Sequence, residues 1–227
     1  MNKLYFYWYG RGQSILQRAE LVFDFLYRID KSLHVKEWRT DRSEIINIDR
    51  IGTLSSLQNH FESIIKESLK ITDVPKNFID QANGAISLKS LDADLKVKFS
   101  VGGAFGEIPS SVVIEIEKAS AETYERIFLS GIDCFNPDWA TITDLEFVRK
   151  VAKQTIDEFW FGWMTYFSKK VELPAGLADF ELIELGRGII VKTTNEFFDV
   201  ELADHRERVL RCVGYFRSKG LFRSSLK

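Results

Sequence analysis

The sequence lacks the residues and the runs that mark several protein classes. Its 227 residues include only two cysteines, Cys134 and Cys212, and no CxxC pair, which excludes a disulfide framework and indicates free thiols in a reducing cytosol. Four prolines, with 45% hydrophobic and 28% charged residues, exclude a disordered chain. No apolar run approaches the ~20 residues of a membrane-spanning helix, and no signal peptide is recognisable. We therefore expect a cytoplasmic protein with no membrane contact.

An excess of basic charge is also missing. The chain has 31 Lys and Arg against 33 Asp and Glu, for a formal charge of −2, which argues against a protein dedicated to direct nucleic-acid binding. A chain of this length buries roughly 70% of the surface that its unfolded form exposes. Because no linker-like run divides it, we expect a single domain over residues 1–227.

Catalytic constellations are absent from the sequence as well. It contains no GxxxxGK[ST], no HExxH, no Cys/His metal spacing and no GxSxG, and its three histidines lie far apart in the chain. The glycines of residues 102–106 follow a predicted strand but lead into another strand, so a turn explains them better than a phosphate site. The sequence therefore predicts no enzyme, no cofactor and no metal.

Periodicity predicts an α+β protein with a mixed, largely antiparallel sheet flanked by amphipathic helices, which could divide into two sub-layers. Alternation or β-prone composition predicts strands at 3–9, 33–38, 95–101, 112–116, 139–142, 159–167 and 188–193. Helical spacing predicts helices at 13–31, 53–70, 121–129, 145–155 and 202–219, the last with an inner face of Leu202, His205, Val209, Cys212 or Val213, and Phe216.

The run FWFGWMTYF at residues 159–167 is the most hydrophobic segment. Its nearly continuous apolar character predicts a central strand buried on both faces. Gly162 within it predicts the close approach of a neighbouring element.

Charge is uneven along the chain. Nine acids lie between positions 107 and 146 against two bases, and eight lie between 172 and 204 against two. The tail from position 205 has seven bases and one glutamate. Such fields steer association with an oppositely charged partner, although they also serve solubility. Two candidate binding clusters follow: Asp133, Asp138, Asp144 and Glu146, and Asp179, Glu181 and Glu184.

Aromatic and glycine landmarks recur along the whole chain: YFYWYGRGQS at the start, a tryptophan-containing strand, NPDWATI, GWMTYFS, an LP pair and GRGIIVKTT. In this order they resemble the bacterial polymorphic-toxin immunity proteins of immunity family 52. The landmark residues are Tyr9, Gly10, Arg11, Trp38, Trp139, Gly162, Trp163, Tyr166 and Gly188. We expect them to hold the fold, because a surface that discriminates a cognate partner must vary between relatives.

The resemblance implies an antitoxin that binds and neutralises a toxin encoded beside it, and so protects the producing bacterium. The toxins paired with this family resemble nucleases of the restriction-endonuclease fold, delivered by secretion systems such as type VI. Acidic segments suit that partner, since a nuclease must present basic surface to phosphates.

Two other functions remain open from the residues alone. One is a small-molecule-binding or enzymatic α+β domain with a pocket lined by aromatics. The other is a structural partner in a secretion apparatus.

Overall fold

The computed structural model describes residues 1–9, 12–48, 52–70, 82, 84–102, 109–155, 157–169, 180–186 and 188–221. Its strands are β1 Asn2–Trp8, β2 Glu37–Thr40, β3 Ile45–Asn47, β4 Gly84–Ser90, β5 Leu95–Val101, β6 Ser110–Ile116, β7 Trp139–Asp144, β8 Met164–Phe167, β9 Glu181–Leu185 and β10 Gly188–Lys192. Its helices are α1 Ile15–Leu33, α2 Thr53–Leu69, α4 Ala121–Phe135 and α5 Ala203–Ser218, with a π-helical turn, η1, at Phe147–Val151.

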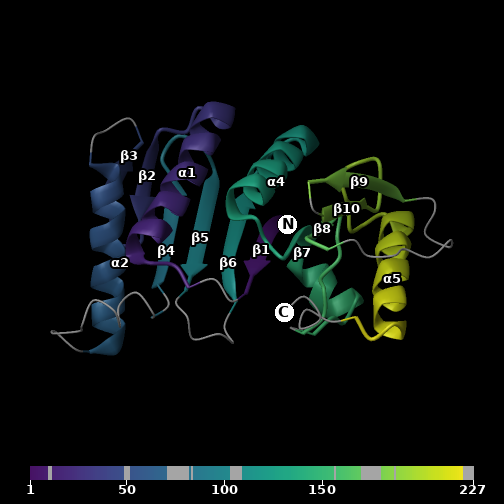
Figure 1. The fold of residues 1–227 in the computed structure, drawn as a ribbon. Coiled ribbons are helices and arrows are strands. Elements are labelled where there is room, and N and C mark those ends of the chain that lie inside the picture. The colour runs from purple at the N-terminus through teal and green to yellow at the C-terminus, as the bar shows by residue number, and fades with distance from the viewer. Residues whose placement is uncertain are drawn as a thin grey trace.

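The ten strands form one sheet in the order β3-β2-β4-β5-β6-β1-β7-β8-β10-β9 (Figure 1). Every recorded pairing is antiparallel, which confirms the α+β class and the predicted pairing of residues 95–101 with 112–116. The N-terminal strand β1 lies inside the sheet, between β6 and β7. Its position joins the two halves of the chain.

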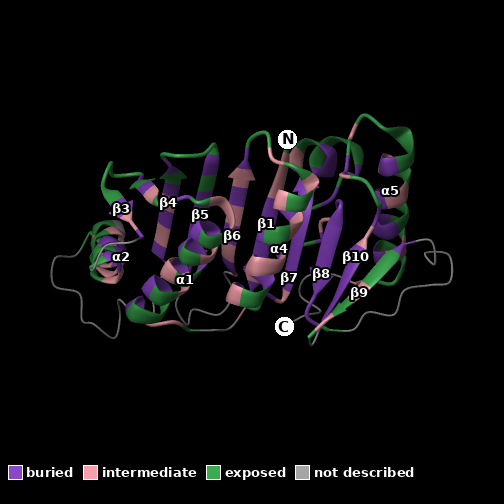
Figure 2. Ribbon diagram, turned by 90° about the horizontal axis from the view of Figure 1, so that it is seen from above, coloured by how far each residue is buried: buried purple, intermediate pink, exposed green. Residues whose placement is uncertain are grey.

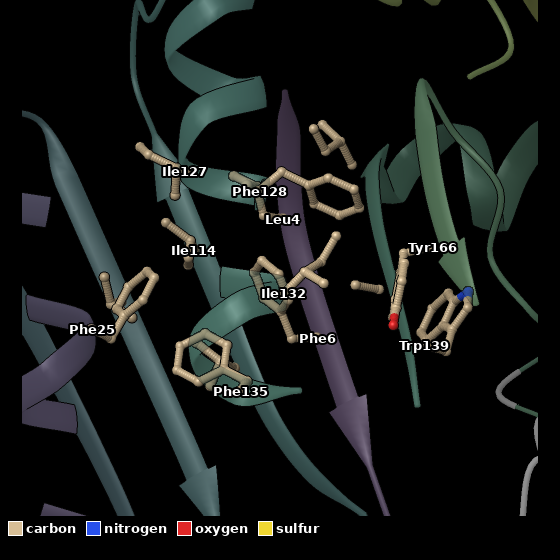
Figure 3. Packing of buried hydrophobic residues seen from close by; sticks show 14 of the residues in the cluster. Leu4, Phe6, Phe25, Ile114, Ile127, Phe128, Ile132, Phe135, Trp139 and Tyr166 are labelled. Carbon is tan, nitrogen blue, oxygen red and sulfur yellow. The ribbon is translucent and has the colours of Figure 1, made fainter. Parts of the chain in front are cut away.

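The two faces of β1 pack against different elements. Leu4, Phe6 and Trp8 are buried on the face that α4 covers, where the Phe6 ring lies 5.7 Å from Phe128 and 5.3 Å from Phe135 (Figure 3). On the other face, the alternate residues Tyr5 and Tyr7 pack against residue Trp160. The helices α1, α2 and α4 share the first face, and α5 lies on the second (Figure 2).

Helix α1 shows why one predicted boundary is wrong. Ser14 and Gln17 form a capping box at its start, with Ser14 Oγ accepting from the Gln17 N–H at 3.3 Å. The helix continues to Leu33 and ends on His34, which has φ +57° and donates its N–H to the Asp30 carbonyl. The predicted strand at 33–38 therefore begins only at Glu37.

No helix in the described ranges is long and apolar enough to cross a membrane.

Other predicted elements differ in extent. The helix predicted at 121–129 continues to Phe135, and the helix predicted at 145–155 reduces to one turn that includes η1. The inner face of α5 is confirmed for His205, Val209, Cys212, Val213 and Phe216, all of which are buried. Residue 202 precedes the helix and is 47% exposed, so its assignment to that face is wrong. Strands β3, β4 and β9 were not predicted.

The aromatic run at 159–167 is only partly a strand. Its last four residues form β8, which is buried between β7 and β10. The preceding residues cross the second face, where Phe159 and Phe161 contact Phe216 of α5, with ring centroids 6.0 and 4.7 Å apart. The continuous apolar character of this run therefore indicates that it is buried, but only its last four residues belong to the sheet.

Gly162 confirms the predicted close approach. A Cβ atom built at this position would lie 2.0 Å from the carbonyl oxygen of Ile142 on β7. The neighbouring Trp163 donates its backbone N–H to that same oxygen at 2.8 Å. The chain can reach β7 at this point only because residue 162 lacks a side chain.

We predict that Trp163→Ala lowers the free energy of unfolding by about 3–5 kcal/mol. Trp163 is 1% exposed, and its indole N–H donates to the Thr194 carbonyl at 3.0 Å, so its removal leaves a cavity and a buried acceptor. Chemical denaturation measures the change. Trp160→Ala serves as the control: this residue is only half-buried, and we expect a smaller loss. Equal losses in the two variants would place Trp163 outside the core.

Candidate functional site

The first predicted acidic cluster is not one cluster. Asp133 lies in the last turn of α4 and Asp138 in the turn that follows, before β7 begins. Asp144 and Glu146 lie at the opposite end of β7, which has six residues and is therefore about 20 Å long. The prediction that these four acids form a single surface is wrong, because a strand separates them into two pairs.

Asp144 is a buried structural group. It is 5% exposed, and its Oδ2 accepts a hydrogen bond from the N-terminal amine of Met1. Its Oδ1 accepts from the backbone N–H of Phe147 at 3.0 Å, at the start of η1. Burial alone would raise the pKa of the Asp144 carboxyl, but these hydrogen bonds and the nearby amine outweigh it and hold the pKa below its usual value. The Asp144 carboxylate is therefore held by groups of its own chain.

Asp138 is also engaged inside the molecule. Its Oδ2 accepts from the backbone N–H of Tyr9 at 2.8 Å, and its own N–H donates to the carbonyl of Tyr7 at 2.8 Å. These bonds fix the turn before β7 against the end of β1. They connect two of the sequence landmarks, the opening aromatic strand and the NPDW turn.

The other two acids of this group are exposed. Asp133 pairs with Arg28 of α1 at 2.5 Å, and its side chain is 71% exposed. Glu146 pairs with Lys150 one helical turn later at 2.9 Å, and its side chain is 77% exposed. Exposed pairs of this kind contribute little to stability, so both carboxylates are available to a binding partner.

The second predicted cluster does not form a single surface either. Asp179 lies outside the described residues, while Glu181 and Glu184 lie on the edge strand β9. Because side chains alternate along a strand, these two glutamates project from opposite faces. Glu181 lies 3.7 Å from Lys192 of β10, which is also 3.7 Å from Glu125 of α4.

Four of the described landmark residues are buried side chains. Trp38, Trp139, Trp163 and Tyr166 are each no more than 2% exposed. A Cβ atom at Gly188 would lie 2.3 Å from the carbonyl oxygen of Phe167, so β10 approaches β8 as closely as residue 162 approaches β7. Gly10 and Arg11 lie outside the described residues.

A hollow of about 560 Å³ lies between α4 and the turn from β9 to β10. Leu129 and Ile132 of α4 line one wall, Leu185 lines the other and Tyr166 lies beneath, with Asp133 at the rim. Sequence patterns did not indicate this site, because Ile132 and Leu185 on its two walls are more than 50 residues apart in the chain.

The titratable groups whose burial raises their pKa lie elsewhere. Burial raises the pKa of Tyr5, raises that of Tyr124 to about 12 and raises that of the Cys134 thiol to about 12. The Tyr124 hydroxyl donates to the backbone carbonyl of Ile116 at 2.8 Å, which makes it a packing residue. Among the described residues, none of these three groups lines the hollow beside Tyr166.

We predict that Asp144→Asn lowers the free energy of unfolding at neutral pH by roughly 1.5–3 kcal/mol, the range for a hydrogen bond to a charged group. Because the pKa of Asp144 is lowered in the folded state, its charge stabilises the protein above the unfolded pKa near 4, and that contribution is lost as pH falls.

Denaturation of parent and variant between pH 7 and pH 3 measures this effect. The difference between them should shrink toward pH 3. Asp24→Asn, an exposed position on α1, is the control and should change stability by less than about 0.5 kcal/mol. A difference that stays constant across the range would show that the carboxylate charge is not its source.

Comparison with solved structures supports the fold. The Pseudomonas aeruginosa T6SS protein PA0821 is similar, with a TM-score of 0.55 and 6% sequence identity over 93% of this chain and 71% of that protein. At this identity the likeness shows the fold alone. Comparison with curated protein sequences gives no match.

Comparison with protein families is more specific. The family described as Immunity protein 52 matches residues 105–224, which is more than half of the chain. The matched range runs from the end of the β5–β6 connection through α5, and it includes Trp139, Trp163, Tyr166 and both close-approach glycines. The chain belongs to the Immunity protein 52 family.

Proposed function

We propose that this protein neutralises a nuclease toxin by binding it directly, as a stoichiometric inhibitor. Membership of the immunity family is the observation that carries the proposal, since an immunity protein acts on a toxin protein by binding. The nuclease identity of the toxin follows from the partners of the family that the landmark residues resemble. The single domain of residues 1–227 would act as one binding unit.

The exposed acids support a nuclease as the partner. A nuclease binds the phosphate backbone with basic side chains, so an inhibitor that meets this surface benefits from carboxylates. Of the seven predicted acids, Asp133, Glu146, Glu181 and Glu184 are exposed. Asp133 stands at the rim of an apolar hollow, which combines a charged contact with a place for an apolar side chain of the toxin.

The printed name of the structural neighbour adds a context. That protein is described as a T6SS protein, and we extend type VI secretion and competition between bacteria to this chain as part of the proposal. A toxin delivered in this way would be met by its immunity protein in the cytoplasm of the recipient cell.

Small-molecule binding is the second candidate function. The hollow between α4 and the β9–β10 turn has a volume typical of ligand sites, and its floor is aromatic. Its lining offers one charged group, Asp133, and two uncharged polar residues, Asn136 and Tyr166, of which Tyr166 is 2% exposed. Toxin binding would use the same surface, and it would not require polar groups that converge on a small ligand.

Co-expression with the toxin domain encoded beside the gene tests the proposal. We expect the parent protein to restore growth and to prevent nucleic-acid cleavage by the purified toxin at a 1:1 ratio. If the toxin is inhibited but cleaves no nucleic acid, the nuclease assignment is wrong and the immunity function stands.

Charge reversal tests the acidic contacts. We expect Asp133→Lys with Glu146→Lys, and separately Glu181→Lys with Glu184→Lys, to slow association with the toxin domain by roughly tenfold at low salt. The effect should weaken near 0.15 M salt, because screening then limits exposed charges to about 8 Å. Glu20→Lys with Asp24→Lys, two exposed acids on α1, is the matched control. If neither reversal differs from the control, the acids take no part in binding.

A further inference from the structure

Among the described elements, no helix covers the second face of the sheet over β2, β4, β5 and β6 (Figure 2). Helix α5 and residues 157–163 pack on this face at β1, β7 and β8. Over β4, β5 and β6 the side chains alternate between buried and more accessible positions, so only one face of these strands is fully packed. On this face, side chains that lie opposite one another on neighbouring strands therefore form rows that contact solvent.

One of these rows is cationic. Arg39 of β2, Lys89 of β4 and Lys96 of β5 lie directly opposite one another in register, and Lys98 follows on the same face of β5. All four are exposed, and none makes an ion pair with any residue that the structure describes. We call these four residues the cationic row.

The carboxylate directly opposite Lys96 is already paired with another lysine. Glu115 of β6 is the cross-strand partner of Lys96, but its Oε1 accepts from Lys3 of β1 at 2.6 Å. Lys96 therefore has a cation opposite it on β4 and, on β6, a glutamate already paired with another lysine.

This arrangement of charges destabilises the folded protein when no partner is bound. Like charges directly opposite on neighbouring strands are destabilising, and uncharged polar residues would keep the face soluble without that penalty. Lysines on edge strands prevent aggregation, but β5 is paired on both sides, with β4 and β6, so edge protection does not explain Lys96 and Lys98. A bound partner that brings negative charge would remove the repulsion.

The position of the row in the sequence suggests its purpose. All four residues precede position 105, where the family match begins. The matched half carries what family members share, whereas recognition of one cognate toxin requires residues that differ between relatives.

We propose that the cationic row is a recognition surface for an acidic patch on the cognate toxin. The proposal rests on the proposed function, in that it takes the toxin as the partner. It adds a basic contact surface to the acidic contacts proposed above. The two proteins would then bind through complementary patches of both charges.

A protein patch fits the row better than a nucleic acid does. Asp92 and Asp94 line the same hollow of about 350 Å³ as Arg39 and Lys89, so carboxylates stand beside part of the row. A protein patch can place separate negative charges between these acids, whereas a phosphate backbone carries its charge continuously. Four cations are also fewer than the six to ten phosphate contacts of a typical DNA-binding protein. Mixed charge at the rim is typical of protein interfaces.

Binding kinetics with the purified toxin domain test the proposal. We expect Lys96→Glu with Lys98→Glu to weaken binding roughly tenfold or more at low salt, mainly by slowing association. Lys169→Glu with Lys219→Glu makes the same change in charge at two exposed lysines in the other half of the chain, and it should change binding less than about twofold. If the parent binds and protects while the two double variants behave alike, the cationic row is not a recognition surface and the proposed function stands.

Two further outcomes separate the proposals. If the parent does not bind the toxin domain, both proposals fail together. If the parent binds a short DNA duplex in fluorescence anisotropy and the Lys96→Glu, Lys98→Glu variant does not, the row takes phosphate, and the assignment to an acidic protein patch is overturned.

Thermal unfolding gives a readout that does not need the toxin. Lys96→Thr removes a cation that faces Lys89, whereas Lys98→Thr makes the same substitution where the opposite residues are Ser87 and Val113. We expect Lys96→Thr to raise the melting temperature of the free protein by roughly 1–3 °C more than Lys98→Thr, with the difference lost in high salt. Equal shifts would show that the row carries no repulsion for a partner to relieve.

Discussion

The pairing of β1 with β6 on one side and with β7 on the other is the contact on which the rest of the structure depends. It joins the strands of the first half of the chain to those of the second, across more than 100 residues of sequence. Phe6 packs against Phe128 of α4 on one face and Tyr5 packs against Trp160 on the other, so a single strand contacts the layers on both sides of the sheet. Without β1 the sheet would end at β6 and at β7 as two open edges.

Close packing of the second half around β7 follows from two glycines and a buried carboxylate. Gly162 and Gly188 allow β7, β8 and β10 to approach at distances that any side chain would prevent. Asp144 at the end of β7 then fixes η1 through the N–H of Phe147 and holds the N-terminal amine. These contacts lie in or beside the range that the family shares, which agrees with a framework role for the landmark residues.

Local periodicity predicted the fold well where the signal lies within one element. The stripe of Ile15, Val22 and Ile29 predicted α1, and the alternation at 95–101 predicted β5, because each pattern reports a face that must be buried. The prediction that the whole run 159–167 is a strand was wrong, because continuous apolar character indicates burial and does not show which residues pair with a neighbouring strand. The roles of Asp138 and Asp144 could not be predicted, since their partners lie 129 and 143 residues away in the chain.

Register explains why charges counted along the chain do not show which charged side chains lie together on the surface. The acids near β7 are close in sequence, yet the strand separates them and burial removes Asp144 from the surface altogether. Arg39, Lys89 and Lys96 are up to 57 residues apart in sequence, and antiparallel pairing places them side by side. The charges that lie together on the surface of a sheet are therefore set by strand pairing and not by their order in the sequence. In this chain the register aligns three cations that form no ion pair among the described residues, and it places them in the part of the chain that the family match does not cover.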